Sequence, residues 1–551
     1  MSTALAALEQ VRTSFGGDAA ATKLALLAAL EHARLRSAAA VERLHEALSF
    51  LRAYPDNAAV LAQVERMLAR FHRRADLRAH RTALADSGIA GTAIHYRFFA
   101  PTALWLARRW PERLRLDRSD PEPAARIANS LPLLVTPAEA AWLKESGLSA
   151  YAALERLRAP GETDAAFMVR RIEALPGDAF TREAFHDAID MAYRLDPGPD
   201  TPSRTRAHWP DAPAAFQREP LRRGRPDLAE QIALAPRSVT ELVPREGARL
   251  IELARGVMIT RARDLDAFAY GDPRDVRLVD DGGGLAFMVN GVIPGRRALV
   301  MAMYGFLTLK NGVPVGYGQV DLTGRAAALS FNTFATFRGG EAAWTFARLL
   351  AMVRHVFGAE SFSLEPYQLG DHNAEGIASG AWWFYQKLGF RPRAPGALAI
   401  MRDELARMKA NPHHRSERAT LRRLAKWHLF YDLDPRKPVP LPDTARPGER
   451  VAHALAHRGG SDRARAIREC RREALALLGM KTLKGWTADE RLAWDRWAPL
   501  VVSIGGLGHW SAAEKRALAR IVRAKGGRRE SDYVALFAAH RRLERDLLAG
   551  R

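Results

Sequence analysis

The chain has 551 residues, of which 48% are hydrophobic and 26% charged, so it is long enough for three or four domains with sizeable cores. Its 83 Lys and Arg residues outnumber its 62 Asp and Glu residues, and the formal net charge of +21 favours anionic partners. A single cysteine, Cys470, excludes an intrachain disulfide framework. No apolar run approaches the roughly 20 residues that span a bilayer, and the N-terminus has no secretory pattern. We therefore expect a cytoplasmic protein without a membrane span.

Residues 1–195 are predicted to form a helical domain. Leucine and valine recur at helical spacing over Leu24–Leu30 and again over Val41–Leu51. Further helices are expected over Thr136–Ser146, which begins with a capping sequence, and over Thr181–Leu195. Residues 196–228 are rich in Pro, Arg and Asp, which is typical of a linker.

Residues 229–400 change character and predict an α+β domain. A helix over Pro244–Arg255 is followed by segments typical of strands. The apolar segment Ala298–Lys310 ends at Asn311-Gly312, a strong hairpin signal, and Val313–Leu322 is its expected partner. A turn at Thr323-Gly324 leads into a third strand over Ala326–Phe337, and Asp280–Gly284 is expected to be a loop or hairpin tip.

A strand–turn–helix unit then follows. The strand ends at Arg338-Gly339-Gly340, and an amphipathic helix is predicted over Glu341–Phe357. Free amides and the dipole at a helix N-terminus can hold a phosphate. A second strand over Ser361–Tyr367 and a helix ending near Phe390 complete the unit.

This order, ending in Phe384-Tyr385-Gln386-Lys387-Leu388-Gly389-Phe390, resembles the acyl-CoA-binding half of the GNAT acetyltransferase superfamily. The resemblance covers under a third of the chain. It implies a central GNAT-like mixed sheet with helices, flanked by all-helical regions over 1–195 and 401–551. It also implies an acyl-CoA-dependent N-acyltransferase that transfers an acyl group, usually acetyl, from acetyl-CoA or another acyl-CoA directly to an amine.

The resemblance also assigns residues to the acyl-CoA site. The end of the first strand is expected to bind the pantetheine arm, and the turn and helix N-terminus the diphosphate. The expected binding residues are Asn332, Phe334, Phe337, Arg338, Gly339, Gly340, Ala342 and Ala343. The tyrosine before the Gly-Phe pair, Tyr385, is expected to protonate the departing thiolate. Glu365, on the second strand, is the candidate general base, and Asp321 and His372 are weaker ones.

Two alternatives remain open. Glu341 lies within the expected diphosphate cradle, and Ala378 replaces an asparagine found in many relatives, so the domain can also be a catalytically inactive scaffold. Residues 401–551 form a basic helical region with 33 Lys and Arg against 18 Asp and Glu, which allows association with nucleic acid. No metal-binding motif is predicted, and the amine acceptor is not identified by the sequence.

Overall fold

The computed structural model describes residues 3–210 and 214–548. The chain divides into two compact units. Unit 1 comprises Met1–Pro220, Arg249–Tyr270 and Lys310–Pro314, and unit 2 comprises Leu221–Ala248, Gly271–Leu309 and Val315–Arg551. The predicted linker 196–228 is therefore divided between the units, and its residues 211–213 lie outside the described residues.

Unit 1 is mostly helical, but it also contains a three-stranded sheet with the strand order β1-β3-β2. The strands are β1 (Ile94–Tyr96), β2 (Leu114–Leu116) and β3 (Tyr193–Leu195). The expectation of an all-helical N-terminal region was therefore wrong, and the helix predicted to reach Leu195 ends at Ile189. Strands of three residues are too short for an alternating pattern to stand out from the surrounding helices.

Two hydrophobic clusters form the core of unit 1. The first few helices pack around Leu44, Leu48 and Val64, and the later ones pack against the buried face of the small sheet. The helices of unit 1 are α1 (Thr3–Val11), α2 (Ala19–His32), α3 (Ala38–Ala53), α4 (Ala58–Arg70), α5 (Ala75–Ala79), α6 (Ala100–Arg109), α7 (Ala124–Leu134), α8 (Pro137–Ser146), α9 (Ala150–Leu157), α10 (Asp164–Glu173), α11 (Ala179–Ile189) and α14 (Asp266–Ala269), while α13 (Pro244–Ile259) has residues in both units.

Unit 2 is built on a nine-stranded sheet with the order β11-β12-β10-β9-β8-β7-β6-β5-β4. Strands β8 and β9 are antiparallel, whereas β9 and β10 are parallel, so the sheet is mixed. The strands are β4 (Ser238–Glu241), β5 (Gly271–Gly282), β6 (Leu285–Val292), β7 (Ala302–Lys310), β8 (Val313–Thr323), β9 (Ala326–Thr333), β10 (Ser361–Leu364), β11 (Arg391–Pro392) and β12 (Leu429–Asp432). The α+β fold class predicted for the central region is confirmed at this level.

The turns that connect the long strands lie where the sequence predicts them. Strand β7 ends at Lys310 and β8 begins at Val313, and the two residues between, Asn311 and Gly312, both have positive φ (49° and 74°). Asn and Gly tolerate this left-handed conformation, which two-residue hairpins require. The predicted tip at Asp280–Gly284 joins β5 and β6.

Strand β12 comes from the C-terminal region that was expected to be all-helical, so that expectation was wrong. It pairs with both β10 and β11, and therefore lies between two strands that precede it in the chain. Its four residues, Leu429–Asp432, follow a short helix and are too few to predict a strand. The sheet thus extends beyond the expected boundary at residue 400.

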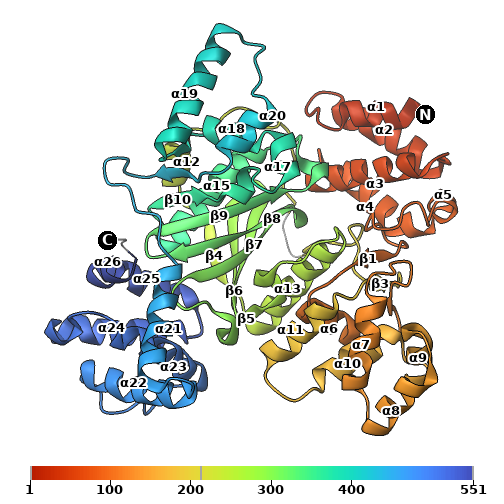
Figure 1. Cartoon of the computed structure of the whole chain (residues 1–551). Coiled ribbons are helices and arrows are strands. Elements are labelled where there is room, and N and C mark those ends of the chain that lie inside the picture. Colours follow the sequence, from red (N-terminus) through yellow and green to blue (C-terminus); the bar gives the residue numbers. More distant parts are fainter. Residues whose placement is uncertain (1–2, 211–213, 549–551) are drawn as a thin grey trace. The chain divides into compact units, whose positions relative to one another are not determined.

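Helix α15 (Ala342–Phe357) connects β9 to β10 and packs its buried side chains against one face of the sheet (Figure 1). The C-terminal helices gather near the β4–β6 part of the same unit (Figure 1). The other helices of unit 2 are α12 (Leu228–Ala233), α16 (Pro366–Leu369), α17 (Ala374–Ser379), α18 (Ala381–Lys387), α19 (Pro395–Ala410), α20 (Arg418–Leu424), α21 (Ala445–Gly459), α22 (Arg463–Leu477), α23 (Ala488–Val502), α24 (Ala512–Lys525), α25 (Glu530–Ala539) and α26 (Arg541–Leu548).

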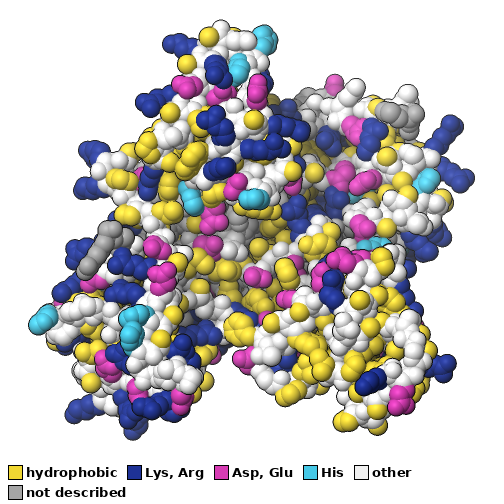
Figure 2. Space-filling view, viewed as in Figure 1, with side chains coloured by type: hydrophobic (Ala, Val, Ile, Leu, Met, Phe, Trp, Pro, Cys, Tyr) yellow, Lys and Arg dark blue, Asp and Glu magenta, His cyan; other side chains and the backbone are white. Residues whose placement is uncertain are grey.

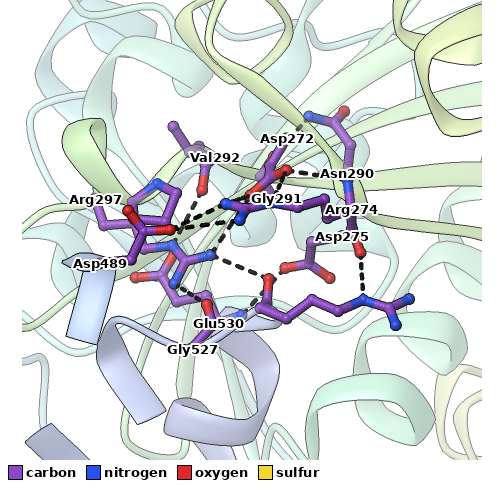
Figure 3. Close-up of polar contacts among 12 residues, drawn as sticks. Asp272, Arg274, Asp275, Asn290, Gly291, Val292, Arg297, Asp489, Gly527 and Glu530 are labelled. Carbon is purple, nitrogen blue, oxygen red and sulfur yellow. Dashed lines mark hydrogen bonds and ion pairs between the residues drawn. The ribbon is translucent and has the colours of Figure 1, made fainter. Parts of the chain in front are cut away.

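A buried charge network joins β5 to helices α24 and α25. The Lys525 ammonium donates hydrogen bonds to Glu530 and, at 2.7 Å, to the carbonyl of Met301. The backbone N–H of Glu530 donates to Asp275, 3.1 Å away. Arg297 bonds the carbonyls of Val292 and Gly527 and lies 3.8 Å from Glu530 (Figure 3). These buried charges fix the C-terminal helices to strand β5 and the segments next to it.

Candidate active site at the divergence of β9 and β10

Strands β9 and β10 run parallel over four residue pairs and then separate. Their pairing extends from Ala326 with Ser361 to Leu329 with Leu364. Strand β10 ends there, while β9 continues to Thr333, still paired with β8 on its other side. The last four residues of β9 therefore have an edge that β10 does not cover.

Side chains from α16 and α18 lie at this uncovered edge. The amide nitrogen of Gln368 donates to the carbonyl of Phe331 on β9 (2.8 Å) and to the hydroxyl of Tyr385 (2.9 Å). Tyr385 is only 3% exposed, and its ring lies 5.2 Å from that of Phe346 on α15. Burial raises the pKa of Tyr385 above its ordinary value, opposed by the Gln368 hydrogen bond. The phenol therefore stays protonated at neutral pH.

The N-terminus of α15 lies at the end of the same strand. Within the described residues, no hydrogen bond uses the amides of Ala342, Ala343 or Trp344, as expected for the first turn of a helix. Glu341 is the N-cap residue, but its side chain makes no capping bond to these amides. Its buried carboxylate instead accepts from the backbone N–H of Arg222 (3.1 Å), whose guanidinium lies 4.7 Å from the Trp344 ring.

The residues expected to bind acyl-CoA are adjacent in space but differ in accessibility. Arg338 and Gly339 are exposed, Gly340 is buried, and Arg338 forms an ion pair with Glu375. Ala342 and Ala343 are half-buried in the first turn of α15. Phe334 and Phe337 are buried, so their side chains belong to the core and only their backbone is available to a ligand. The amide nitrogen of Asn332 donates to the Tyr317 hydroxyl, 3.3 Å away.

The face of the sheet opposite α15 is polar around β8 and β9. Paired residues in neighbouring strands point to the same face. Asp321 pairs with Ala328, Gln319 with Ser330 and Tyr317 with Asn332, so all three β8 side chains share this face. The alternate residues, such as Val320 and Leu329, pack in the core instead.

Asp321 is the carboxyl group of this polar face whose pKa is shifted most. Burial raises its pKa from 3.8 to about 7, and the negative charge of Glu365 adds to the increase, while hydrogen bonds from Gln319 at 2.9 and 3.1 Å oppose it. A carboxylate with a pKa near 7 is suited to accept a proton at neutral pH. Glu365 is the residue after β10 and is exposed. Burial lowers the pKa of the half-buried His428, and the negative charge of Glu365 partly offsets this change.

The two predicted catalytic residues thus approach the divergence from opposite faces. Tyr385 is on the α15 face, because it packs against Phe346, which contacts Phe331 on β9. Glu365 follows Leu364, whose side chain is in the core, so alternation places Glu365 on the polar face with Asp321. Beyond Leu329, β9 and β10 are no longer paired, so no continuous sheet separates the two faces there.

From the sequence alone Asp321 is only a weaker candidate for the general base, and Gln368 is not predicted to belong to the site. The signal for Asp321 was present, because Tyr317, Gln319 and Asp321 are polar at every second position of an otherwise apolar strand. Gln368 was hidden by the expectation that the second strand continues to Tyr367. The strand ends at Leu364, and α16 begins at Pro366, a residue favoured in the first turn of a helix.

The raised pKa of Asp321 predicts a pH-dependent stability. The folded protein keeps this proton up to about pH 7, whereas the unfolded chain loses it near 3.8, so the free energy of unfolding falls as pH rises between these values. Asp321→Asn removes this loss, which is at most about 4 kcal/mol and is reduced by solvent screening. Urea unfolding at pH 5 and pH 8 measures it. Asp403→Asn, at an exposed position on α19, is the control. If the free energy of unfolding changes by the same amount between pH 5 and pH 8 in both variants, the raised pKa of Asp321 is contradicted.

Comparison of the chain with protein-family models, with curated proteins and with solved structures gave no match. In residues 3–210 and 214–548, no group of three or more His, Cys, Asp or Glu side chains is arranged to hold a metal ion. Across these same ranges no helix is both long and apolar enough to cross a membrane.

Proposed function

We propose that unit 2 is an acyl-CoA-dependent N-acyltransferase whose site is the divergence of β9 and β10. The observation that carries this proposal is the coincidence of three features at the end of β9. They are the uncovered strand edge, the protonated phenol of Tyr385 and the N-terminus of α15. The family resemblance expects these features in this order along the chain, with a strand for pantetheine, helix amides for the diphosphate and a phenol for the sulfur.

The proposed reaction places the thioester in the gap between the strands. An amine attacks the acyl carbonyl from the polar face, and Asp321 or Glu365 takes the proton that the nitrogen loses. The new C–N bond forms as the C–S bond breaks, and Tyr385 gives its proton to the departing thiolate. Tyr385 lies on one face of the sheet and the two carboxyl groups on the other. The phenol can therefore reach the sulfur and the carboxylate the amine, and neither acid nor base transfers a proton to the other.

The diphosphate is proposed to bind the amides of Ala342, Ala343 and Trp344, next to the cationic side chains of Arg222 and Arg338. Helix N-termini favour anions, and each arginine adds attraction. The buried carboxylate of Glu341 acts in the opposite direction and lowers the affinity.

Two observations favour the second candidate, a catalytically inactive scaffold. Gln368 already occupies the Phe331 carbonyl, one of the groups that pantetheine would use, and Glu341 is buried beside the diphosphate position. In this alternative Gln368 and Tyr385 close the divergence permanently. Activity instead requires the Gln368 side chain to turn away from β9 when acyl-CoA binds.

Nucleic-acid binding by residues 401–551 has less support, because many arginines there are paired with carboxylates. Lys and Arg are interspersed with Asp and Glu over the C-terminal helices (Figure 2). The ion pairs include Arg458–Glu473, Arg465–Glu469, Arg471–Asp495, Arg523–Glu490 and Arg542–Glu514.

Calorimetric titration of acetyl-CoA into the full-length protein tests the proposal. We expect saturable binding, and we expect Glu341→Gln to bind several-fold more tightly, because the amide keeps an acceptor for Arg222 but removes the negative charge. Glu360→Gln, at a half-exposed carboxylate beyond α15, is the control. No heat at millimolar acetyl-CoA from either protein would overturn the enzymatic proposal and leave the scaffold.

A further inference from the structure

The small sheet of unit 1 carries a row of basic side chains across its three strands. Arg194 on the central strand β3 pairs directly with His95 on β1 and with Arg115 on β2. Paired residues point to the same face, so the two arginines are neighbours on one side of the sheet. The flanking residues, including Tyr193 and Leu195, point to the other face and are buried. Two like charges directly opposite each other destabilise a sheet unless an anion lies between them.

Asp196 offsets only part of this repulsion. Its two carboxylate oxygens accept from the Nε atoms of Arg115 (3.1 Å) and Arg194 (2.8 Å). Both arginine side chains remain 50% exposed. Among the described residues, their terminal Nη nitrogens have no hydrogen-bond partner. One carboxylate therefore holds two guanidinium groups side by side and leaves their outer donors unused.

A cavity of about 510 Å³ lies over this row, within the size range of small-molecule sites. The acidic lining residues are Asp117, Glu155 and Asp164, and Asp117 accepts from the backbone N–H and the hydroxyl of Ser119. Asp164 accepts from the amides of Leu116 and Ala165 and from Arg118. Glu155 accepts from Arg118 and Arg158. The cavity thus contains spare guanidinium donors, while most of its carboxylate oxygens already accept hydrogen bonds, and this combination favours a ligand rich in acceptor oxygens.

We propose that this cavity binds a small phosphate ester, with the phosphate held between Arg115 and Arg194. The two guanidinium forks present donors from adjacent strands, which suits a dianionic group with three terminal oxygens. A carboxylate ligand has only two oxygens and one charge, so it satisfies fewer of the free Nη donors of the two guanidinium groups than a phosphate does. The rest of the cavity, toward Arg118 and Ser119, accommodates the organic part of the ligand.

Titration calorimetry of phenyl phosphate into the full-length protein at low ionic strength tests this site. We expect saturable binding that weakens about tenfold or more in Arg115→Gln/Arg194→Gln. The matched control is Arg70→Gln/Arg81→Gln, which removes the same charge from exposed positions of unit 1 outside the cavity and leaves the affinity within about twofold. Benzoate, which has the same ring on a carboxylate, is expected to bind about tenfold more weakly.

Arg194→Lys separates a specific site from general attraction and from misfolding. Lysine keeps the positive charge but lacks the planar, bidentate donors of the guanidinium group. We therefore expect an affinity for phenyl phosphate between those of the wild type and of Arg115→Gln/Arg194→Gln, with an unchanged circular dichroism spectrum. Equal affinity in the wild type and in Arg115→Gln/Arg194→Gln would overturn the proposal and place phosphate binding elsewhere, such as at α15. Equal binding of benzoate, or no heat with millimolar phenyl phosphate, would overturn it as well.

Discussion

The variant Tyr385→Phe is expected to release CoA about 100-fold more slowly than the wild type while binding acetyl-CoA with nearly the same affinity. The substitution keeps the ring that packs against Phe346 and removes only the hydroxyl. The raised pKa makes this phenol a weak acid, which places the expected effect at the lower end for general acids. The rate is measured as thiol release with a panel of primary amines, and the affinity by calorimetry.

Tyr431→Phe is the control for this variant. Tyr431 lies on strand β12, whereas Tyr385 lies on helix α18, and the Tyr431 ring is 5.6 Å from that of Phe390, so the change removes a different, half-buried phenol of unit 2. It is expected to leave both quantities unchanged. If Tyr385→Phe lowers rate and affinity equally, the hydroxyl supports binding or packing, and the proposed role as an acid is wrong.

Lys525→Met is expected to lower the free energy of unfolding by up to about 3–5 kcal/mol, since it removes the hydrogen-bonded cation of the fully buried Glu530 and leaves Arg297, 3.8 Å away, as a weaker partner. Burial raises the pKa of Glu530, an effect that Lys525 opposes in the wild type. Without the lysine, Glu530 takes up a proton on folding more readily, so the loss of stability is smaller at pH 5 than at pH 8. Denaturant unfolding at the two pH values measures both effects.

The double variant Lys525→Met/Glu530→Leu is expected to be more stable than Lys525→Met alone, because no buried charge of this pair remains. Lys515→Met, on the same helix, is the control. Its ammonium bonds the carbonyl of Gly508 at the surface, so a change below about 1 kcal/mol is expected. Equal destabilisation by Lys525→Met and Lys515→Met would mean that the buried pair of Lys525 and Glu530 adds little to stability.

The long strands and their turns could be predicted because their signals are local. Asn311-Gly312 marks a hairpin by backbone chemistry alone, and α8 begins at the capping box of Thr136 and Glu139. The position of β12 between β10 and β11 could not be predicted. It depends on pairing between segments far apart in the sequence, and nothing in Leu429–Asp432 names its partners.

The candidate site was predictable in part for the same reason. The helix N-terminus after β9 and the aromatic helix with Tyr385 follow from local patterns, and the structure brings both to one strand end. The hydrogen bonds of Gln368 and the burial of Asp321 depend on neighbours in space. These neighbours raise the pKa of Asp321 and place the Gln368 amide on the carbonyl of Phe331, and the sequence pattern predicts neither contact.

The insertion of β12 also constrains how the protein is made. Strand β11 has β12 as its neighbour in the sheet, yet it leaves the ribosome first. Until the chain has been synthesised as far as Asp432, β10 has an open hydrogen-bonding edge and β11 has no place to dock. Helices α19 and α20 are made in this interval, so the nascent chain must carry an unfinished sheet while they form.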